Sequence, residues 1–278
     1  MRGSAADGPA TQRVDVKKKR IIAQRYTVPA LDKALDIVEL LAATQDKLTM
    51  REIGRTVGRS VSQIFRTLKV LEQRGYIERD GETDRFGVTN RLFELGMTRP
   101  PMLNLTGAAY PVMIETAAAL DQSLHLAVPS NEQMVVIARV ENPGGAAFLV
   151  KIGNRRSLAD AVSGRVLLAF QPQPIQDKWL ALVRKAKGRG FDEAALRRSL
   201  AQIRERGYEH ANSAYVVGIT DIGVPLFDGG DSAVACLSMP FVSRLDHRRT
   251  IGEAIEAMRV AARRVTAALA AATGRRRS

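Results

Sequence analysis

The chain has 278 residues, 45% of them hydrophobic, which is enough for about two domains with buried cores. Its formal net charge of +13 favours a polyanionic partner, either nucleic acid or an anionic membrane surface. A single cysteine, Cys236, excludes an internal disulfide and is typical of a reducing compartment, so we expect a cytoplasmic protein. Because no apolar run reaches the roughly 18 residues of a membrane span, we expect no membrane association.

The chain begins with a stretch that has the composition of a disordered arm. Residues 1–28 are rich in Gly, Ala, Gln and charged side chains, and they include the cations Lys18 and Arg20. Such an arm either reaches DNA phosphates and the minor groove or forms a solvated tail that aids solubility. The sequence leaves both interpretations open. A second basic tail, residues 274–278, follows the last predicted helix.

Two helices are predicted directly after the arm. Residues 30–43 have helical spacing of apolar side chains, with the inward positions Leu31, Leu35, Val38 and Leu41. Thr49 and Glu52 then form a capping-box pattern, which predicts the start of a short second helix. Gly58 ends this helix in a tight turn.

A third helix and a hairpin complete a winged helix-turn-helix pattern. Ser60 provides a second capping pattern, and Gly75 ends the helix that it opens. Residues 76–79 and 85–88 read as two strands joined by a turn. This order of capped helix, turn, capped helix and hairpin predicts a DNA-binding domain over residues 29–90.

The third helix has two chemically different sides. The side expected to pack against the module consists of Val61, Ile64, Phe65, Leu68 and Leu71. The opposite side is polar and basic, and its Arg and Gln side chains are the types that pair bidentately with guanine and adenine. We therefore predict DNA contacts, including one from Phe65, by Ser60, Ser62, Gln63, Phe65, Arg66, Lys69, the wing residues Arg79 and Arg85, and the arm residues Lys18 and Arg20.

Residues 91–107 are predicted to form a linker helix that Pro100 and Pro101 break or kink. Residues 108–273 are predicted to form a second domain, which makes the whole chain an α+β protein. Its predicted elements are helices at 107–120, 162–170, 175–185 and 193–206, a long final helix, and strands at 124–128, 134–140, 148–152, 208–215, 219–227 and 232–239.

The last predicted hairpin has one apolar face and one mixed face. If the hairpin is symmetric about its glycine turn, Asp221 lies opposite Ser238 and Gly223 lies opposite Cys236. The apolar face is expected to pack on helices and consists of Ile222, Val224, Leu226, Ala235 and Leu237. The mixed face carries an acid, a thiol and a hydroxyl, which suits a small ligand cavity. The alternative is a solvent-facing edge hairpin, in which an aspartate is ordinary.

A candidate small-molecule site follows from this mixed face. Amides at a helix start near Ser163 and Gly164 are suited to an anionic group. Asp221 disfavours a second carboxylate close by and favours a hydroxyl, amine, amide or hydrazide donor. The predicted effector-binding residues are Ser163, Gly164, Ser213, Tyr215, Asp221, Cys236 and Ser238.

Several segments occur in the order of a known family, at residues 28–37, 48–54, 64–77, 125–128, 139–141, 164–170, 203–208 and 237–238. Through them, roughly residues 26–272 resemble the IclR family of bacterial transcription regulators. The resemblance implies a GAF-like effector domain, homodimers or homotetramers, repression or activation of transcription with repression as the expected sign, and a small organic acid, often aromatic, as effector. A two-fold dimer in turn implies a partly palindromic DNA operator. The chain departs from the family pattern at Ala159, Ser213, Ala214, Asp221 and Pro240, which argues against a simple keto acid or hydroxy acid.

Three other functions compete with this interpretation. Cys236 as a nucleophile, with His125 or His210 as base, would indicate an enzyme, although its apolar strand is more typical of a structural thiol. The winged helix of a protein-interaction module would contact protein, and a basic nucleoid protein would show no sequence preference. The histidines lack metal-ligand spacing and no nucleotide-binding glycine pattern occurs, so no metal or cofactor is expected.

Overall fold

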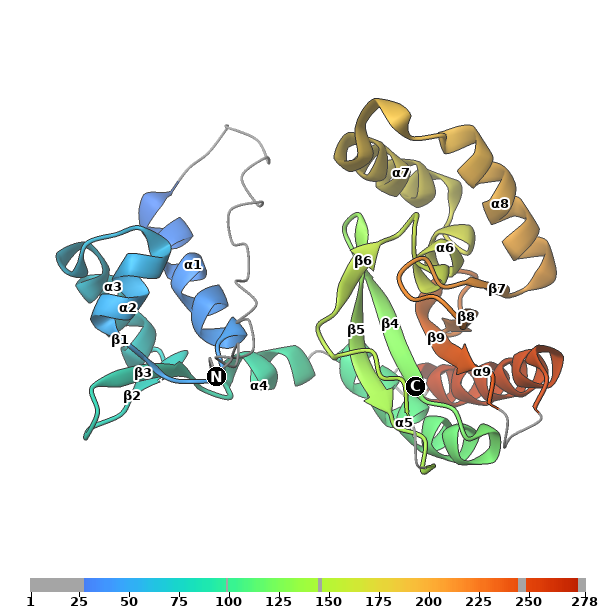
Figure 1. Cartoon of the computed structure of the whole chain (residues 1–278), viewed down its shortest axis with the longest axis horizontal. Coiled ribbons are helices and arrows are strands. Elements are labelled where there is room, and N and C mark those ends of the chain that lie inside the picture. Colours follow the sequence, from blue (N-terminus) through green and yellow to red (C-terminus); the bar gives the residue numbers. More distant parts are fainter. Residues whose placement is uncertain (1–27, 99, 145–146, 245–248, 275–278) are drawn as a thin grey trace, which may run out of the picture. The chain divides into compact units, whose positions relative to one another are not determined.

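The computed structural model describes residues 28–98, 100–144, 147–244 and 249–274 (Figure 1). Lys18 and Arg20 of the predicted arm lie outside the described residues, as does nearly all of the predicted basic tail. The chain divides into two compact units, one ending at Gly96 and one beginning at Met97, and each is described by itself. Within the described ranges, no helix is both long enough and apolar enough to cross a membrane.

The first unit is a small helical module with a three-stranded sheet. Its elements are α1 (Pro29–Ala43), β1 (Leu48–Thr49), α2 (Met50–Val57), α3 (Val61–Gln73), β2 (Ile77–Arg79), β3 (Arg85–Val88) and α4 (Arg91–Met97). The strands follow the order β1-β3-β2 and pair antiparallel, so the β2–β3 hairpin forms the wing beside α3 (Figure 1).

The helix ends of this module follow from local sequence chemistry. The Thr49 amide donates to Glu52 Oε2 at 2.7 Å, and the Glu52 amide donates back to Thr49 Oγ1 at 3.3 Å, which closes the predicted capping box. Gly58 and Gly75 take positive φ angles of 67° and 71°, the left-handed conformation that glycine adopts most easily. Both predicted helix ends are therefore confirmed.

The core of the first unit buries fewer of the apolar side chains of α1 and α3 than the sequence predicts. Its buried side chains are Ile37, Leu41, Ile53, Ile64, Leu68, Leu71, Ile77 and Phe86. Leu31 and Leu35 were expected inside but are 55% and 52% exposed, because α1 buries the stripe that contains Ile37 and Leu41. Val61 and Phe65 of α3 are likewise 42% and 48% exposed, since they flank the buried stripe of that helix.

The second unit combines one sheet with two groups of helices. Its elements are α5 (Pro100–Leu120), β4 (Leu124–Ser130), β5 (Gln133–Val140), β6 (Arg155–Ser157), α6 (Val162–Ala169), α7 (Gln173–Lys187), the 3-10 helix η2 (Gly188–Gly190), α8 (Glu193–Arg206), β7 (Glu209–Asn212), β8 (Ile219–Phe227), β9 (Ala233–Val242) and α9 (Ile251–Gly274). The antiparallel sheet has the order β6-β5-β4-β9-β8-β7. The predicted α+β class is confirmed.

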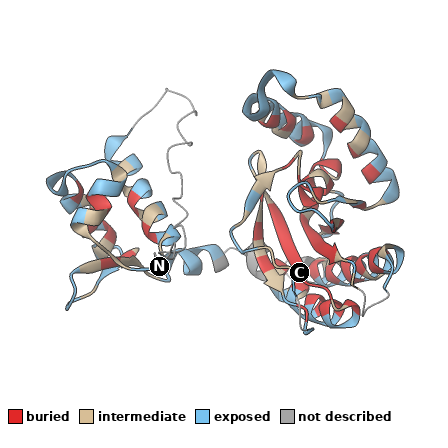
Figure 2. Cartoon of the chain, viewed as in Figure 1, coloured by how far each residue is buried: buried red, intermediate tan, exposed pale blue. Residues whose placement is uncertain are grey.

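Each face of this sheet has its own apolar core. On one face, α5 and α9 pack against β4, β8 and β9 (Figure 2). On the other face, α6, α7 and α8 enclose a second core with residues of β4, β5 and β9. The predicted apolar face of the β8–β9 hairpin lies wholly in the first of these cores, so that expectation is confirmed.

The register of the β8–β9 hairpin differs from the symmetric one. Asp221 pairs with Pro240 and Gly223 pairs with Ser238, because the turn holds one extra residue and a bulge follows Leu226. Together these shift the pairing by two residues, which leaves every side chain on the expected face.

Two further expectations are corrected. Residues 148–152 form no strand, and the edge strand β6 lies at Arg155–Ser157 instead. The predicted linker over 91–107 consists of α4 and the start of α5. Pro100 begins α5, because proline at the first helical position sacrifices no hydrogen bond.

Candidate functional site

The outward surface of α3 is the first candidate site. Ser60, Ser62 and Arg66 are exposed, and the half-exposed Phe65 ring lies beside them. Within the described residues, the Arg66 guanidinium has neither an ion pair nor a hydrogen bond. A helix that presents an uncommitted guanidinium and small hydroxyls has the chemistry needed to contact base edges and phosphates.

Two other predicted α3 residues have local partners. Gln63 Oε1 accepts the Ser60 amide at 3.0 Å, and the Gln63 carbonyl accepts Lys33 Nζ at 2.8 Å. Lys69 Nζ lies 2.9 Å from Glu72 Oε2. Gln63 therefore helps to start α3, and Lys69 would need to exchange its exposed ion pair for a phosphate.

The wing arginines stabilise the hairpin. Arg79 pairs with Asp84 at 2.8 Å and lies 5.9 Å from the Phe86 ring centroid. Arg85 donates to the Lys47 carbonyl at 2.8 Å and to Glu52 Oε2 at 3.3 Å. Both guanidinium groups thus have intramolecular partners, in contrast to Arg66.

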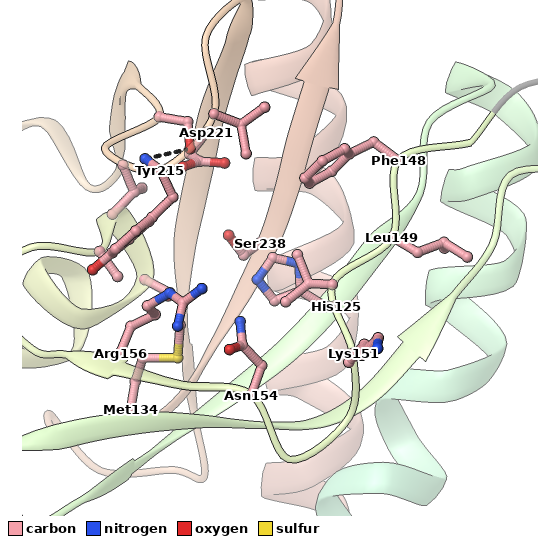
Figure 3. A pocket seen from close by; sticks show the side chains of 16 residues that line it. His125, Met134, Phe148, Leu149, Lys151, Asn154, Arg156, Tyr215, Asp221 and Ser238 are labelled. Carbon is pink, nitrogen blue, oxygen red and sulfur yellow. Dashed lines mark hydrogen bonds between the residues drawn. The ribbon is translucent and has the colours of Figure 1, made fainter. Parts of the chain in front are cut away.

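The second candidate site is a cavity of about 270 Å³ in the second unit (Figure 3). It lies among β4, β8, β9, the 148–154 segment, the start of α6 and the 213–216 loop. Its lining mixes apolar and polar side chains: His125, Met134, Phe148, Leu149, Val150, Lys151, Asn154, Arg156, Ala161, Val162, Ser163, Ser213, Tyr215, Val216, Asp221 and Ser238.

His125 is a buried polar side chain in the lining of this pocket. It lies on β4 opposite Ser238 of β9, and its Nδ1 atom is buried with no hydrogen-bond partner within the described residues. Burial lowers the pKa of His125 to about 4, so the ring is neutral at neutral pH and keeps one donor and one acceptor nitrogen. The His125 ring lies among the side chains that line the pocket (Figure 3).

Charged side chains line the same pocket. Burial raises the pKa of the Asp221 carboxyl, while a Ser213 hydrogen bond and the charge of Arg165 oppose this shift. The Arg156 guanidinium carbon lies 4.4 Å from the centroid of the Tyr215 ring, which holds it over that ring. Ser238 donates its hydroxyl to the Ile222 carbonyl at 3.1 Å, so its oxygen remains free to accept.

Five of the predicted effector-binding residues line this pocket, namely Ser163, Ser213, Tyr215, Asp221 and Ser238. Two do not. Cys236 belongs to the core beneath α6–α8, where burial raises the pKa of its thiol well above its usual value. Gly164 is a packing residue, because a Cβ there would lie 2.6 Å from the Leu158 carbonyl oxygen.

Sequence reasoning missed the residues that come from irregular segments. Phe148 and Lys151 lie in the segment 148–152, which was expected to be a strand. Asn154 follows that segment, and Arg156 lies on the short β6. His125 was treated as a packing residue or a catalytic base. Its position on a strand among buried apolar neighbours was the only available signal, and that signal does not distinguish a packed ring from a ligand contact.

The structure gives no support to a reactive thiol or a metal site. The raised pKa of Cys236 keeps it protonated, and a thiol is a weak nucleophile in that form. His210 stacks on Tyr208 with 6.0 Å between ring centroids. Across the described ranges, no three His, Cys, Asp or Glu side chains gather in a way that would hold a metal ion.

Comparison with known proteins places both units in one family. Residues 30–81 match the IclR helix-turn-helix domain, and residues 101–267 match the C-terminal domain of the bacterial transcriptional regulator IclR. The transcriptional regulator KdgR of Escherichia coli is 26% identical over 247 residues, which cover 88% of this chain and 94% of KdgR. BhcR of Paracoccus denitrificans is 28% identical, with coverage of 76% and 77%.

Solved structures agree with this assignment. Thermotoga maritima IclR superposes with a TM-score of 0.65 and 26% identity, and the match covers 86% of this chain and 98% of that one. An IclR homologue of Microbacterium hydrocarbonoxydans, solved with 4-hydroxybenzoate, has a TM-score of 0.71 at 22% identity, with 87% and 99% covered. The chain therefore belongs to the IclR family of bacterial transcriptional regulators, which are DNA-binding proteins with an effector-binding domain and not enzymes.

Proposed function

We propose that this chain is a transcriptional repressor that binds a partly palindromic operator as a homodimer or homotetramer. A small organic effector, aromatic or bearing hydrogen-bond donors, binds the second-unit pocket and changes the operator affinity. The observation that carries this proposal is the pairing, in one chain, of an uncommitted Arg66 on α3 with a pocket that leaves His125 Nδ1 without a partner.

The pocket lining supports an effector with a ring. Phe148 and Tyr215 supply aromatic surfaces, and Met134 and Val150 add apolar contact area. Asp221 and the free acceptor of Ser238 suit donor groups. The family relative that was solved with 4-hydroxybenzoate binds a molecule of this kind.

Assembly is supported by apolar side chains on α4. Leu92, Phe93 and Leu95 are 40%, 67% and 40% exposed, and such a group of exposed apolar side chains on one short helix is a candidate contact surface. A second copy that covered these side chains would form a two-fold dimer, which reads two half-sites related by the same symmetry.

The test is a gel shift with DNA from the region upstream of the gene that encodes the chain, repeated over a range of salt. Operator binding is expected to weaken steeply as salt rises, because phosphate contacts release counterions. Arg66→Ala is expected to weaken specific binding by about tenfold to a hundredfold, the cost of one bidentate base contact.

Arg91→Ala is the matched control, because Arg91 is also exposed in the first unit but pairs with Glu94 on α4. It is expected to bind like the unmodified protein. Equal operator affinity of Arg66→Ala and the control would contradict a DNA-reading role for α3. Equal affinity for unrelated DNA would indicate a nonspecific nucleoid protein instead.

A further inference from the structure

Two opposite charges line the pocket without pairing. Asp221 is on β8 and Arg156 is on β6, at opposite parts of the sheet. Within the described residues, neither has an oppositely charged atom within the 4.0 Å that defines an ion pair, and the two do not pair with each other. A space therefore separates a carboxylate from a guanidinium inside one cavity.

Two other pairs of partly buried charges in the second unit are in direct contact. Arg165 and Glu209 lie 2.9 Å apart, and Arg244 and Asp121 also lie 2.9 Å apart. Removing a charge from water without a partner is costly, so partly buried charges in proteins are usually paired. Asp221 and Arg156 are thus available to a ligand that brings both missing partners.

The surroundings hold the two groups in place. Arg156 is fixed over the Tyr215 ring at 4.4 Å, and its Nη1 donates to the Arg155 carbonyl at 3.2 Å. In the view of Figure 3, the Ser238 hydroxyl and the His125 ring lie to one side of the line from Asp221 to the Arg156 guanidinium. The space between the charges is therefore bordered by one neutral imidazole and one hydroxyl, which suit the uncharged middle of a ligand.

We propose that the pocket binds a small zwitterion, with a protonated amine at Asp221 and a carboxylate at Arg156. A cavity of about 270 Å³ restricts the body between them to about one ring, in contact with Phe148 and within reach of His125. The exposed Lys151 adds a second cation to the pocket lining. This inference rests on the proposed function, because it names the chemical class of the effector for the same pocket.

The test is calorimetric titration of the full chain with a matched panel of probes. Phenylalanine, 3-(aminomethyl)benzoate and 4-(aminomethyl)benzoate are zwitterions with increasing distance between the charges. Benzoate and benzylamine are single-charge controls of the same ring size. At least one zwitterion is expected to bind about tenfold tighter than both controls, the contribution of one further charge-assisted hydrogen bond.

Two variants test which residue binds each charged end of the zwitterion. Asp221→Asn is expected to remove the advantage of the zwitterion over benzoate, and Arg156→Gln is expected to remove its advantage over benzylamine. The matched controls are Arg155→Gln and Asp228→Asn. Arg155 is the neighbouring arginine, which bonds Gln133 and Ser130, and Asp228 is an exposed acid in the hairpin loop. Both controls are expected to bind the panel like the unmodified protein.

The proposal is overturned if no zwitterion of the panel binds, if benzoate or benzylamine binds as tightly as every zwitterion, or if folded Asp221→Asn keeps the full preference. The panel on the unmodified protein decides this even where a variant fails to fold. A gel shift run in parallel tests the proposed regulator function separately from the proposed effector class. Operator binding that persists beside a failed panel leaves the proposed regulator intact, and zwitterion binding without operator binding contradicts the regulator alone.

Discussion

At the scale of single residues, His125 shows how a buried polar atom marks a site. A buried nitrogen without a partner costs stability, so its presence in a well-packed strand indicates a use outside folding. Arg66 is informative in a different way, because it is exposed and, among the described residues, lacks the partners that Arg79 and Arg85 have, which leaves its guanidinium available for a contact with DNA. For both residues the sequence predicted the helix or strand that carries the side chain, but the lack of a partner is visible only in the three-dimensional structure.

His125 also predicts a pH dependence of stability. Its pKa is about 4 in the folded chain against an ordinary value of 6.5, so the unfolded chain binds the proton more tightly. Stability is therefore complete above pH 6.5 and declines as the pH falls from 6.5 towards 4, by on the order of 3 kcal/mol.

His125→Phe replaces the imidazole by a phenyl ring, which cannot take up that proton. The variant is expected to lose much of this decline and to match or slightly exceed the parent in stability at pH 7, because an unsatisfied nitrogen is removed. Urea unfolding at pH 4.5 and pH 7 measures both effects. Identical pH profiles for the two proteins would show that His125 is not buried in its neutral form.

At the scale of elements, regular segments were predictable and irregular ones were not. β8 and α8 have the bounds that the sequence predicts, because alternating apolar side chains mark the second half of β8 and capping residues mark both ends of α8. The register of β8 on β9 was missed by two residues, because neither the extra residue in the turn nor the bulge after Leu226 has a sequence signature. Residues 148–152 were expected to form a strand, and the 148–154 segment instead supplies much of the pocket wall.

Two helical glycines give a matched pair of predictions about packing. A Cβ at Gly164 of α6 would lie 2.6 Å from Leu158 backbone atoms, whereas one at Gly107 of α5 meets nothing within 4 Å. Gly164→Ala is expected to cost about 1–3 kcal/mol through overpacking, and Gly107→Ala to gain about 0.5–1 kcal/mol from helix propensity. Thermal unfolding compares them, and a stabilised Gly164→Ala would disprove the close approach of α6 to Leu158.

At the scale of the whole molecule, the division into a DNA-binding unit and an effector unit follows from the change in hydrophobic period along the chain. The sequence predicted the class of each unit because capping boxes and strand alternation act locally. It did not predict which charges remain unpaired, because pairing depends on contacts between distant segments such as β6 and β8. The five pocket residues that were predicted all lie next to recognisable turns, strands or helix starts.

The exposed side chains of α4 make a prediction about assembly. Phe93 is 67% exposed on a helix with two further exposed leucines, so a charge there would oppose burial against a second copy. Phe93→Glu is expected to shift the protein towards monomer in analytical ultracentrifugation, without a loss of thermal stability in the isolated monomer. An unchanged sedimentation profile would place the dimer contact elsewhere.

The reading of bases by α3 is the claim on which the regulator depends, and sequence discrimination tests it most directly. Fluorescence anisotropy would measure the affinity of the parent and of Arg66→Ala for the operator and for operators with one base pair changed at a time. If α3 reads bases, Arg66→Ala loses discrimination at one position of each half-site and keeps it at the others. An identical discrimination profile for the two proteins would contradict a base-reading role for α3.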